Sequence, residues 1–262
     1  MYVLTLRIVA LLTVCITMLF SPQAYAAESS SELVNKAGMQ RMLSQRIAKA
    51  YFYLGSDISV NEAKLQLNQA LERFKNNHAL LKENVQDSET KDLLSFVEET
   101  FTEYRDLVNK PYTQENATRV LELSGTLLEA CHSVVLNVET KSGLHVDRIV
   151  NISGKQRMLS QRVAKLYIAY QAGFRDDNTV NQLKSAIGDF ESGLKTLLSE
   201  GRSNKEIEAL LIKTEKEWAR ISPYFLKVRK GGLPLMVLTA TDEITKLADR
   251  ITDLYVELGP GK

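Results

Sequence analysis

Apolar residues recur every three or four positions through most of the chain beyond residue 30, the spacing that places them on one face of an α-helix. Short segments rich in Gly, Pro, Asp and Ser interrupt this spacing. Pro223 should end or kink the seventh helix. Long helices joined by short turns pack as antiparallel bundles, so the predicted fold class is all-α. The pattern predicts helices near residues 31–54, 60–84, 88–109, 114–140, 144–172, 178–200, 203–228 and 235–257.

The two halves of this pattern are copies of one module. The segment NKAGMQRMLSQRIAKAY at residues 35–51 recurs as NISGKQRMLSQRVAKLY at residues 151–167, an offset of 116 positions. We therefore predict two tandem antiparallel four-helix bundles, a first module at residues 28–141 and a second at 142–258. The two modules are joined either by a turn or by one long helix shared across residues 141–143.

The first 26 residues have the pattern of an export signal. Arg7 precedes an apolar run over residues 8–20, and a small-x-small cleavage motif ends at Ala26. This run is shorter than the roughly 20 residues that a membrane-spanning helix needs. We expect a signal peptide, residues 1–26, that is cleaved after Ala26 to release a periplasmic protein; an uncleaved membrane anchor is the alternative. Cleavage leaves Cys131 as the only cysteine, so the exported fold has no intrachain disulfide.

Composition narrows the classes of partner. The chain has 33 Lys plus Arg and 32 Asp plus Glu, a formal net charge of +1. A nearly neutral protein has no electrostatic footprint for nucleic acid or for an anionic membrane surface. No apolar run beyond residue 26 approaches the length of a membrane span, so we predict none in the mature chain.

The repeated segment has two distinct faces when it is placed on a helix at about 100° per residue. Met39, Leu43 and Ile47 form an apolar stripe that should face the core. Small residues on the opposite side should let a second helix approach closely. We call this side the arginine face, and it consists of Ala37, Arg41, Ser44, Ala48 and Phe52 in the first copy and Ser153, Arg157, Ser160, Ala164 and Ile168 in the second.

The two arginines lack a negative partner on their own helices. No Asp or Glu occurs from residue 35 to 54 or from 151 to 174. Burying an unpaired charge is costly, so we predict that a small anion is the partner of Arg41 and Arg157. Guanidinium groups suit planar oxyanions, and two of them give roughly 6 kcal/mol of gross attraction, which corresponds to micromolar binding. The alternative interpretation is a pair of solvated surface charges.

The pattern Asn-x-(Ala/Ser)-Gly-x-Gln-Arg-Met-Leu-Ser-Gln-Arg-x-Ala-Lys-x-Tyr resembles the signature of the PilJ-type domain, the N-terminal periplasmic domain of type IV pilus methyl-accepting chemotaxis transducers. Its core, Gly-x-x-Arg-Met-x-Ser-x-Arg, also resembles the P-box of nitrate/nitrite sensor kinases. The resemblance implies a helical domain in which paired arginines, one from the first helix of each of two protomers, hold nitrate, and glycines permit close approach. With the hydroxyl donors of the same face included, the candidate ligand-binding residues are Arg41, Arg157, Gly38, Gly154, Ser44 and Ser160.

Receptors of this kind continue into a transmembrane helix and an output domain, whereas this sequence ends at Lys262. We therefore expect a periplasmic sensory module that binds nitrate or nitrite and reports to a membrane receptor or sensor-kinase partner. The anion site lies either between the two modules of one chain or between the chains of a homodimer. The alternative is a protein-interaction module of a chemoreceptor or type IV pilus assembly, whose arginine face docks a partner helix without a small ligand.

The residues indicate neither catalysis nor a metal site. Glu129 and His132 have the Glu-x-x-His spacing of di-iron bundles, but only one copy occurs where two are needed. The three histidines, His78, His132 and His145, are scattered along the chain, and no Ser or Cys has a base and an orienting group near it in sequence. We expect no metal, no cofactor and no enzymatic activity.

Overall fold

The computed structural model describes residues 28–200, 204–225, 227–228 and 233–259. Within these ranges the chain forms helices and no strand, which confirms the all-α prediction. The predicted signal peptide lies outside the described residues. The helices are α2 (Ser30–Gly55), α3 (Val60–Asn84), α4 (Ser88–Val108), α5 (Gln114–Ser142), α6 (His145–Gln171), α7 (Asp177–Glu200), α8 (Lys205–Phe225) and α9 (Pro234–Leu258).

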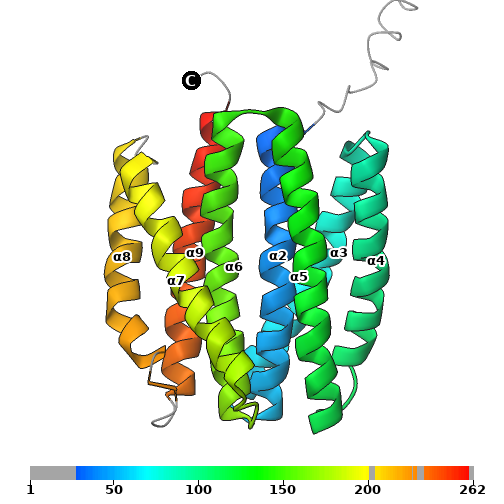
Figure 1. Ribbon diagram of the computed structural model, residues 1–262, viewed down its shortest axis with the longest axis vertical. Helices are drawn as coiled ribbons and strands as arrows, with labels where there is room; N and C mark the ends of the chain where they lie inside the picture. Colours follow the sequence, from blue (N-terminus) through cyan, green and yellow to red (C-terminus); the bar gives the residue numbers. More distant parts are fainter. Residues whose placement is uncertain (1–27, 201–203, 226, 229–232, 260–262) are drawn as a thin grey trace, which may run out of the picture.

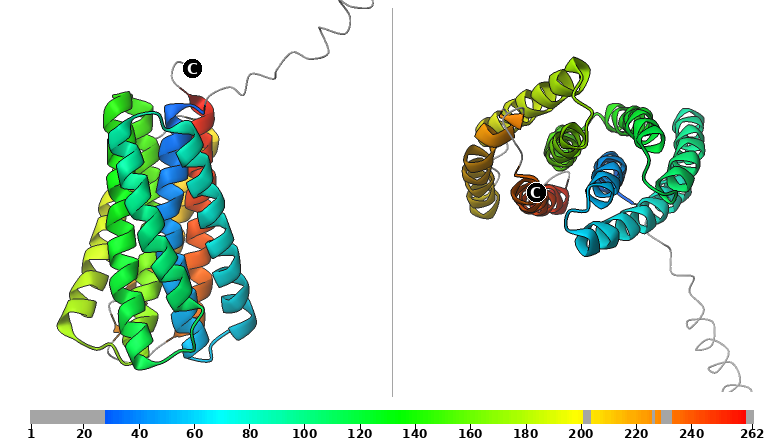
Figure 2. Two further views of the ribbon diagram at one scale, coloured as in Figure 1. Left: turned by 90° about the vertical axis from the view of Figure 1, so that its right-hand side faces the viewer. Right: turned by 90° about the horizontal axis from the view of Figure 1, so that it is seen from below.

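The helices are arranged as two four-helix bundles packed side by side, as predicted (Figure 1). Helices α2 to α5 form the first bundle and α6 to α9 the second. The end-on view in Figure 2 shows α2 and α6 in the middle, with α5 beside α2 and α9 beside α6. The repeated segment therefore lies on the two helices that join the bundles.

The connection between the bundles is a turn and not a shared helix. Helix α5 ends at Ser142, and Gly143 adopts a left-handed conformation with φ of 63°. Glycine takes this conformation without steric cost. Helix α6 then starts at His145 and runs back beside α5. The reversal at Gly143 excludes one long helix and brings α2 and α6 together.

Proline has the predicted effect on α8. The helix ends at Phe225, two residues beyond Pro223, whereas hydrophobic periodicity alone extends it to residue 228. Proline removes a backbone donor and crowds the preceding turn, so a helix rarely continues far past it. No helix among the described residues has both the length and the hydropathy to cross a membrane.

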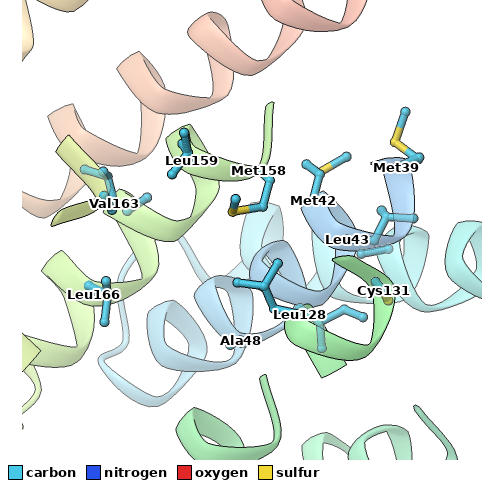
Figure 3. Packing of buried hydrophobic residues seen from close by; sticks show 14 of the residues in the cluster. Met39, Met42, Leu43, Ala48, Leu128, Cys131, Met158, Leu159, Val163 and Leu166 are labelled. Carbon is cyan, nitrogen blue, oxygen red and sulfur yellow. The ribbon is translucent and has the colours of Figure 1, made fainter. Parts of the chain in front are cut away.

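Both faces of the two central helices are buried. The stripe around Leu43 is buried, and so is the arginine face, which meets other helices as predicted. Tyr104 of α4 donates to the carbonyl oxygen of Ser44 at 2.9 Å, and the hydroxyls of Ser153 and Ser160 lie 2.8 and 2.6 Å from those of Thr252 and Thr245 on α9. Figure 3 shows Met42 from α2 and Met158 from α6, two equivalent residues of the repeat, among the buried side chains of this region. At one end of α2, the ring of Phe52 meets that of Phe174 edge to face at a centroid distance of 5.4 Å. The interface between the bundles is thus part of the hydrophobic core.

Candidate functional site

Two arginine side chains are buried between the bundles. Arg41 is 1% exposed and Arg157 is 0% exposed. A Cβ atom built on Gly38 would lie 3.3 Å from Nη2 of Arg41 and 3.6 Å from Nη2 of Arg157, so the two nitrogens are separated by at most the sum of these distances, 6.9 Å. One chain therefore brings both predicted anion-binding arginines together, and they are not solvated surface charges.

The two predicted glycines make room for these guanidinium groups. A Cβ atom on Gly154 would lie 3.1 Å from Nη2 of Arg157 and 3.9 Å from Nη2 of Arg41, which mirrors the surroundings of Gly38. Glycine inside a helix costs roughly 1 kcal/mol relative to alanine. Its presence at both positions is explained by the close approach of the guanidinium groups, which a methyl group would crowd.

Each arginine reaches across to the other copy of the motif. Nη2 of Arg41 donates to Oδ1 of Asn151 at 2.7 Å, and Nη2 of Arg157 donates to Oδ1 of Asn35 at 2.8 Å. The two contacts are equivalent, so the pair has approximate two-fold symmetry within one chain. Both asparagines belong to the repeated motif, six positions before each arginine, but no contact was predicted for them.

The two asparagines connect the arginines to acidic residues of the outer helices. Nδ2 of Asn35 donates to Oδ1 of Asp253 on α9 at 3.2 Å. Nδ2 of Asn151 donates to Oε2 of Glu139 on α5. Each guanidinium group is thus oriented by an amide that a carboxylate holds in place.

The group that contacts Nη1 differs between the two arginines. Nη1 of Arg157 forms an ion pair with Oδ1 of Asp249 on α9 at 2.6 Å. At the equivalent position on α5, Nη1 of Arg41 lies 3.2 Å from Nδ1 of His132. Burial, reinforced by Arg41, lowers the pKa of His132 below its usual value of 6.5. The imidazole is therefore neutral at pH 7 and accepts a hydrogen bond without neutralising the arginine.

The prediction that the chain provides no negative partner is therefore wrong for Arg157, whereas Arg41 has a histidine at the equivalent position. Asp249 was missed because it lies on a helix distant in sequence, where an isolated Asp has the pattern of a surface charge. Burial, followed by the charge of Arg157, lowers the pKa of Arg41 to about 10. Arg41 stays protonated at neutral pH and forms no ion pair with any described residue.

Ser44 and Ser160 contact the backbone of the two arginines. The hydroxyl of Ser44 donates to the carbonyl oxygen of Arg41 at 2.8 Å, and that of Ser160 donates to the carbonyl oxygen of Arg157 at 2.8 Å. The hydroxyl of Ser44 also accepts from Nε2 of Gln45 at 3.0 Å, and that of Ser160 lies 2.6 Å from the hydroxyl of Thr245, so both hydroxyls are engaged within the chain. The two serines therefore position the turns that carry the arginines, and we leave them out of the proposed ligand contacts.

A cavity reaches Arg41 from the α5 side of the molecule. It has a volume of about 200 Å³, several times the roughly 30 Å³ that one water molecule occupies in the liquid. Nε of Arg41 is buried without a hydrogen-bond partner among the described residues. The lining comes from α2, α5, α6 and α7 and consists of Arg41, Leu128, Glu129, His132, Lys155, Met158, Arg162 and Asp189.

The fold and the repeated motif define an all-helical domain that is present twice in the chain. The chain belongs to the family described as the type IV pili methyl-accepting chemotaxis transducer N-terminal domain, whose model matches residues 25–125 and again residues 140–245. The resemblance to a tandem PilJ-type pair is thereby confirmed, and the family is sensory and non-catalytic. The comparisons with curated proteins and with solved structures gave no match. The described residues contain no group of three or more His, Cys, Asp or Glu suited to a metal ion.

Proposed function

We propose that this protein is a periplasmic sensory module that binds a small oxyanion, nitrate or nitrite, between Arg41 and Arg157. The observation that carries the proposal is the buried guanidinium group of Arg41, which has no carboxylate partner among the described residues and lies beside a second buried arginine. The proposal includes export of the chain by its first 26 residues.

The balance of charge supports a monovalent ligand. The pair carries two positive charges, and Asp249 is the carboxylate in direct contact with it. A buried charge without a partner destabilises a fold by several kcal/mol, so binding one negative charge beside Arg41 is favourable. A planar oxyanion also accepts two parallel hydrogen bonds from one guanidinium group, which a spherical chloride ion does not.

The surroundings favour a small anion. Both arginines are nearly inaccessible, and the cavity that touches Arg41 is about 200 Å³. Nε of Arg41 lacks a hydrogen-bond partner among the described residues, so it is a donor available to the ligand. We propose that the anion enters from this cavity, on the side of α5, and not from the side where Asp249 faces Arg157.

The position of the site suggests how binding is reported. An anion held between Arg41 and Arg157 adds an attraction between α2 and α6, the two helices that join the bundles. The relative position of the bundles would then be read by a membrane receptor or sensor-kinase partner. One chain contains both arginines, so the proposed site does not require a homodimer.

The alternative of a partner helix docked on the arginine face has less support. Arg41, Ala48 and Phe52 of that face are already buried within the chain. A chemoreceptor or pilus protein would need another surface for docking. We therefore place the anion first among the two candidate functions.

Titration calorimetry of the purified protein with nitrate, nitrite and chloride at constant ionic strength tests the proposal. We expect micromolar binding of at least one oxyanion and its loss in the variant Arg41→Gln. The exposed Arg220, which pairs with Glu217 on its own helix, provides the matched control Arg220→Gln, which should bind normally. Absence of heat with both oxyanions, or unchanged binding in the double variant Arg41→Gln with Arg157→Gln, would refute the proposal.

A further inference from the structure

Two equivalent lysines of the repeat have different surroundings. Lys49 on α2 and Lys165 on α6 are both buried, at 0% and 3% exposure. Nζ of Lys49 forms an ion pair with Oδ1 of Asp242 at 2.5 Å. Nζ of Lys165 donates to Oγ of Ser124 at 3.0 Å and forms no ion pair with a described residue. Burial, reinforced by the nearby charge of Arg162, pushes the pKa of Lys165 well below its usual value.

Asp242 is surrounded by donors from both bundles. Its Oδ1 accepts from Nζ of Lys49 at 2.5 Å, from Nε2 of Gln161 at 3.0 Å and from Nη2 of Arg46 at 3.4 Å. Its Oδ2 accepts from Nε2 of Gln66 at 2.8 Å. We call these residues the Asp242 cluster. In it, one carboxylate is held by two cations and two amides.

The second copy of the repeat has the same four donor types. At an offset of 116 positions, the residues equivalent to the donors of the Asp242 cluster are again a lysine, an arginine and two glutamines. They are Lys165, Arg162, Gln45 and Gln182. These four residues come from α6, α2 and α7, as the symmetry of the two bundles requires.

The carboxylate is the part that the second copy lacks. Helices α5 and α9 correspond at an offset of 117 positions, since His132 and Asp249 face the two equivalent arginines. At this offset the residue equivalent to Asp242 is Gly125. A Cβ atom built on Gly125 would meet no heavy atom of the described residues within 4 Å beyond its own helix backbone. There is therefore room for a Cβ atom at Gly125.

The donors near Gly125 also make fewer contacts than those of the Asp242 cluster. Nε of Arg46 donates to Oε1 of Gln161 at 3.3 Å, but the equivalent Nε of Arg162 and Oε1 of Gln45 are both buried without a partner among the described residues. Nη2 of Arg162 donates to Gln182 at 3.4 Å, and Nε2 of Gln45 donates to the carbonyl oxygen of Ser124 at 2.9 Å.

Glu129 on α5 lies four residues beyond Gly125, about one helical turn away. It is exposed and lines the cavity beside Arg162, but it forms no hydrogen bond or ion pair with Arg162 or Lys165 within the described structure. The positive charge of this cluster is therefore not neutralised by direct contact with a carboxylate of the chain.

We propose that a small free carboxylate, of the size of formate or acetate, binds beside Gly125 between Lys165 and Arg162, at the position that the side chain of Asp242 occupies in the other copy. Glycine plus acetate provides the same carboxylate, at the same distance from the backbone, as an aspartate. Lys165 lies eight residues beyond Arg157 on α6, about 12 Å along the helix. The ammonium group of the proposed site therefore lies about two helical turns from the arginine pair, although Arg162 lines the same cavity as Arg41. The inference does not rest on the proposed oxyanion function.

The test compares thermal unfolding of the wild-type protein and of Gly125→Asp in sodium formate, acetate, nitrate or chloride at one ionic strength. We expect acetate or formate to raise the wild-type midpoint by about 3 to 6 °C at about ten times the dissociation constant. Gly125→Asp should unfold at a higher temperature and lose this response, because its own carboxylate fills the site. An equal rise in chloride, no rise with either carboxylate, or an unchanged response in Gly125→Asp would overturn the inference.

Two further variants make the result specific. Asp242→Gly should create a second site of the same kind in the first copy. The unfolding midpoint of this variant should fall, and acetate should restore more of the loss than the same concentration of chloride does. Lys165→Met should fold and lose the carboxylate response; if it keeps the response, the inference is wrong. The Arg41→Gln variant should keep the acetate response while losing nitrate binding, so failure of one site is distinguishable from failure of the other.

Discussion

The outer helices α5 and α9 present different side chains to equivalent cations of the two copies. Helix α9 offers Asp242 and Asp249, whereas the equivalent positions of α5 are Gly125 and His132. The residues that they face on the central helices are repeated in both copies. On the α9 side an aspartate therefore contacts the cations of each cluster, whereas Arg41 and Lys165 on the α5 side form no ion pair with a described residue.

This difference separates structural from binding roles within a duplicated scaffold. Breaking a buried ion pair is strongly destabilising, and an unpaired buried cation carries a similar cost. On the α9 side the chain meets this requirement with its own carboxylates. On the α5 side no described carboxylate forms an ion pair with Arg41 or Lys165, and the two proposals assign this role to anions from solution. Variants that remove a carboxylate from the α9 side or add one to the α5 side test this interpretation.

The largest effect is expected from removing a carboxylate on the α9 side. Asp242→Asn leaves the buried Lys49 and the partly buried Arg46 without this carboxylate, and we expect a loss of about 3 to 5 kcal/mol in the free energy of unfolding. Urea denaturation at pH 7 measures it. The matched variant Lys165→Met removes a cation that has no carboxylate and should be neutral or stabilising. A loss below about 1 kcal/mol in Asp242→Asn would show that the balance of charge matters little.

The same carboxylate should make the stability of the protein fall at acidic pH. Burial raises the pKa of Asp242, but Lys49 and Arg46 outweigh this effect and bring it to about 2. Burial lowers the pKa of Lys49 to about 8 against the opposing pull of Asp242, so both groups are charged between these values. Because the folded-state pKa of Asp242 lies below its usual 3.8, its contribution is complete above pH 4 and is lost as the pH falls toward 2.

We expect this loss to be about 2 kcal/mol. Urea denaturation at a series of pH values, for the wild-type protein and Asp242→Asn, isolates it. The two stability curves should converge between pH 4 and pH 2. Parallel curves would mean that Asp242 is not the group responsible.

A smaller effect is expected from making the α9 side resemble the α5 side. Asp249→His removes the carboxylate next to Arg157 and gives both arginines a histidine partner. The added positive character should tighten nitrate binding by about tenfold, or about 1.4 kcal/mol. Calorimetry at pH 7 measures the affinity. Weaker binding in this variant would show that Asp249 positions Arg157 for the anion and does not merely neutralise it.

The smallest effects concern glycines. Gly38→Ala and Gly154→Ala place a methyl group 3.3 and 3.1 Å from a guanidinium nitrogen, and we expect each to lose about 1 kcal/mol of stability despite the gain in helix propensity. Gly125→Ala, where the added Cβ atom meets open space, should instead gain up to about 1 kcal/mol. Thermal unfolding compares the three, and equal gains at all of them would contradict the close approach of the arginines.

Much of this fold was predictable because helix periodicity is a local property of the sequence. Small residues beside Arg41 also showed that its face meets a helix, and the exact repetition of the motif identified the partner arginine. The partners on α5 and α9 were not predictable in the same way. His132 and Asp249 lie on helices whose sequences have diverged, and their contacts arise only when the bundles dock. Lys49 and Lys165 were visible as a repeated pair, but their different surroundings depend on Asp242.

The most direct test of the unpaired charge at Arg41 is to titrate His132→Asp and the wild-type protein with nitrate at pH 7 and to measure the heat of binding by calorimetry. The new aspartate gives Arg41 the ion pair that Asp249 gives Arg157, so the chain itself supplies the missing charge. We predict micromolar nitrate binding in the wild-type protein and at least a tenfold loss in His132→Asp, together with greater stability without ligand. Equal nitrate affinity in both proteins would contradict the account.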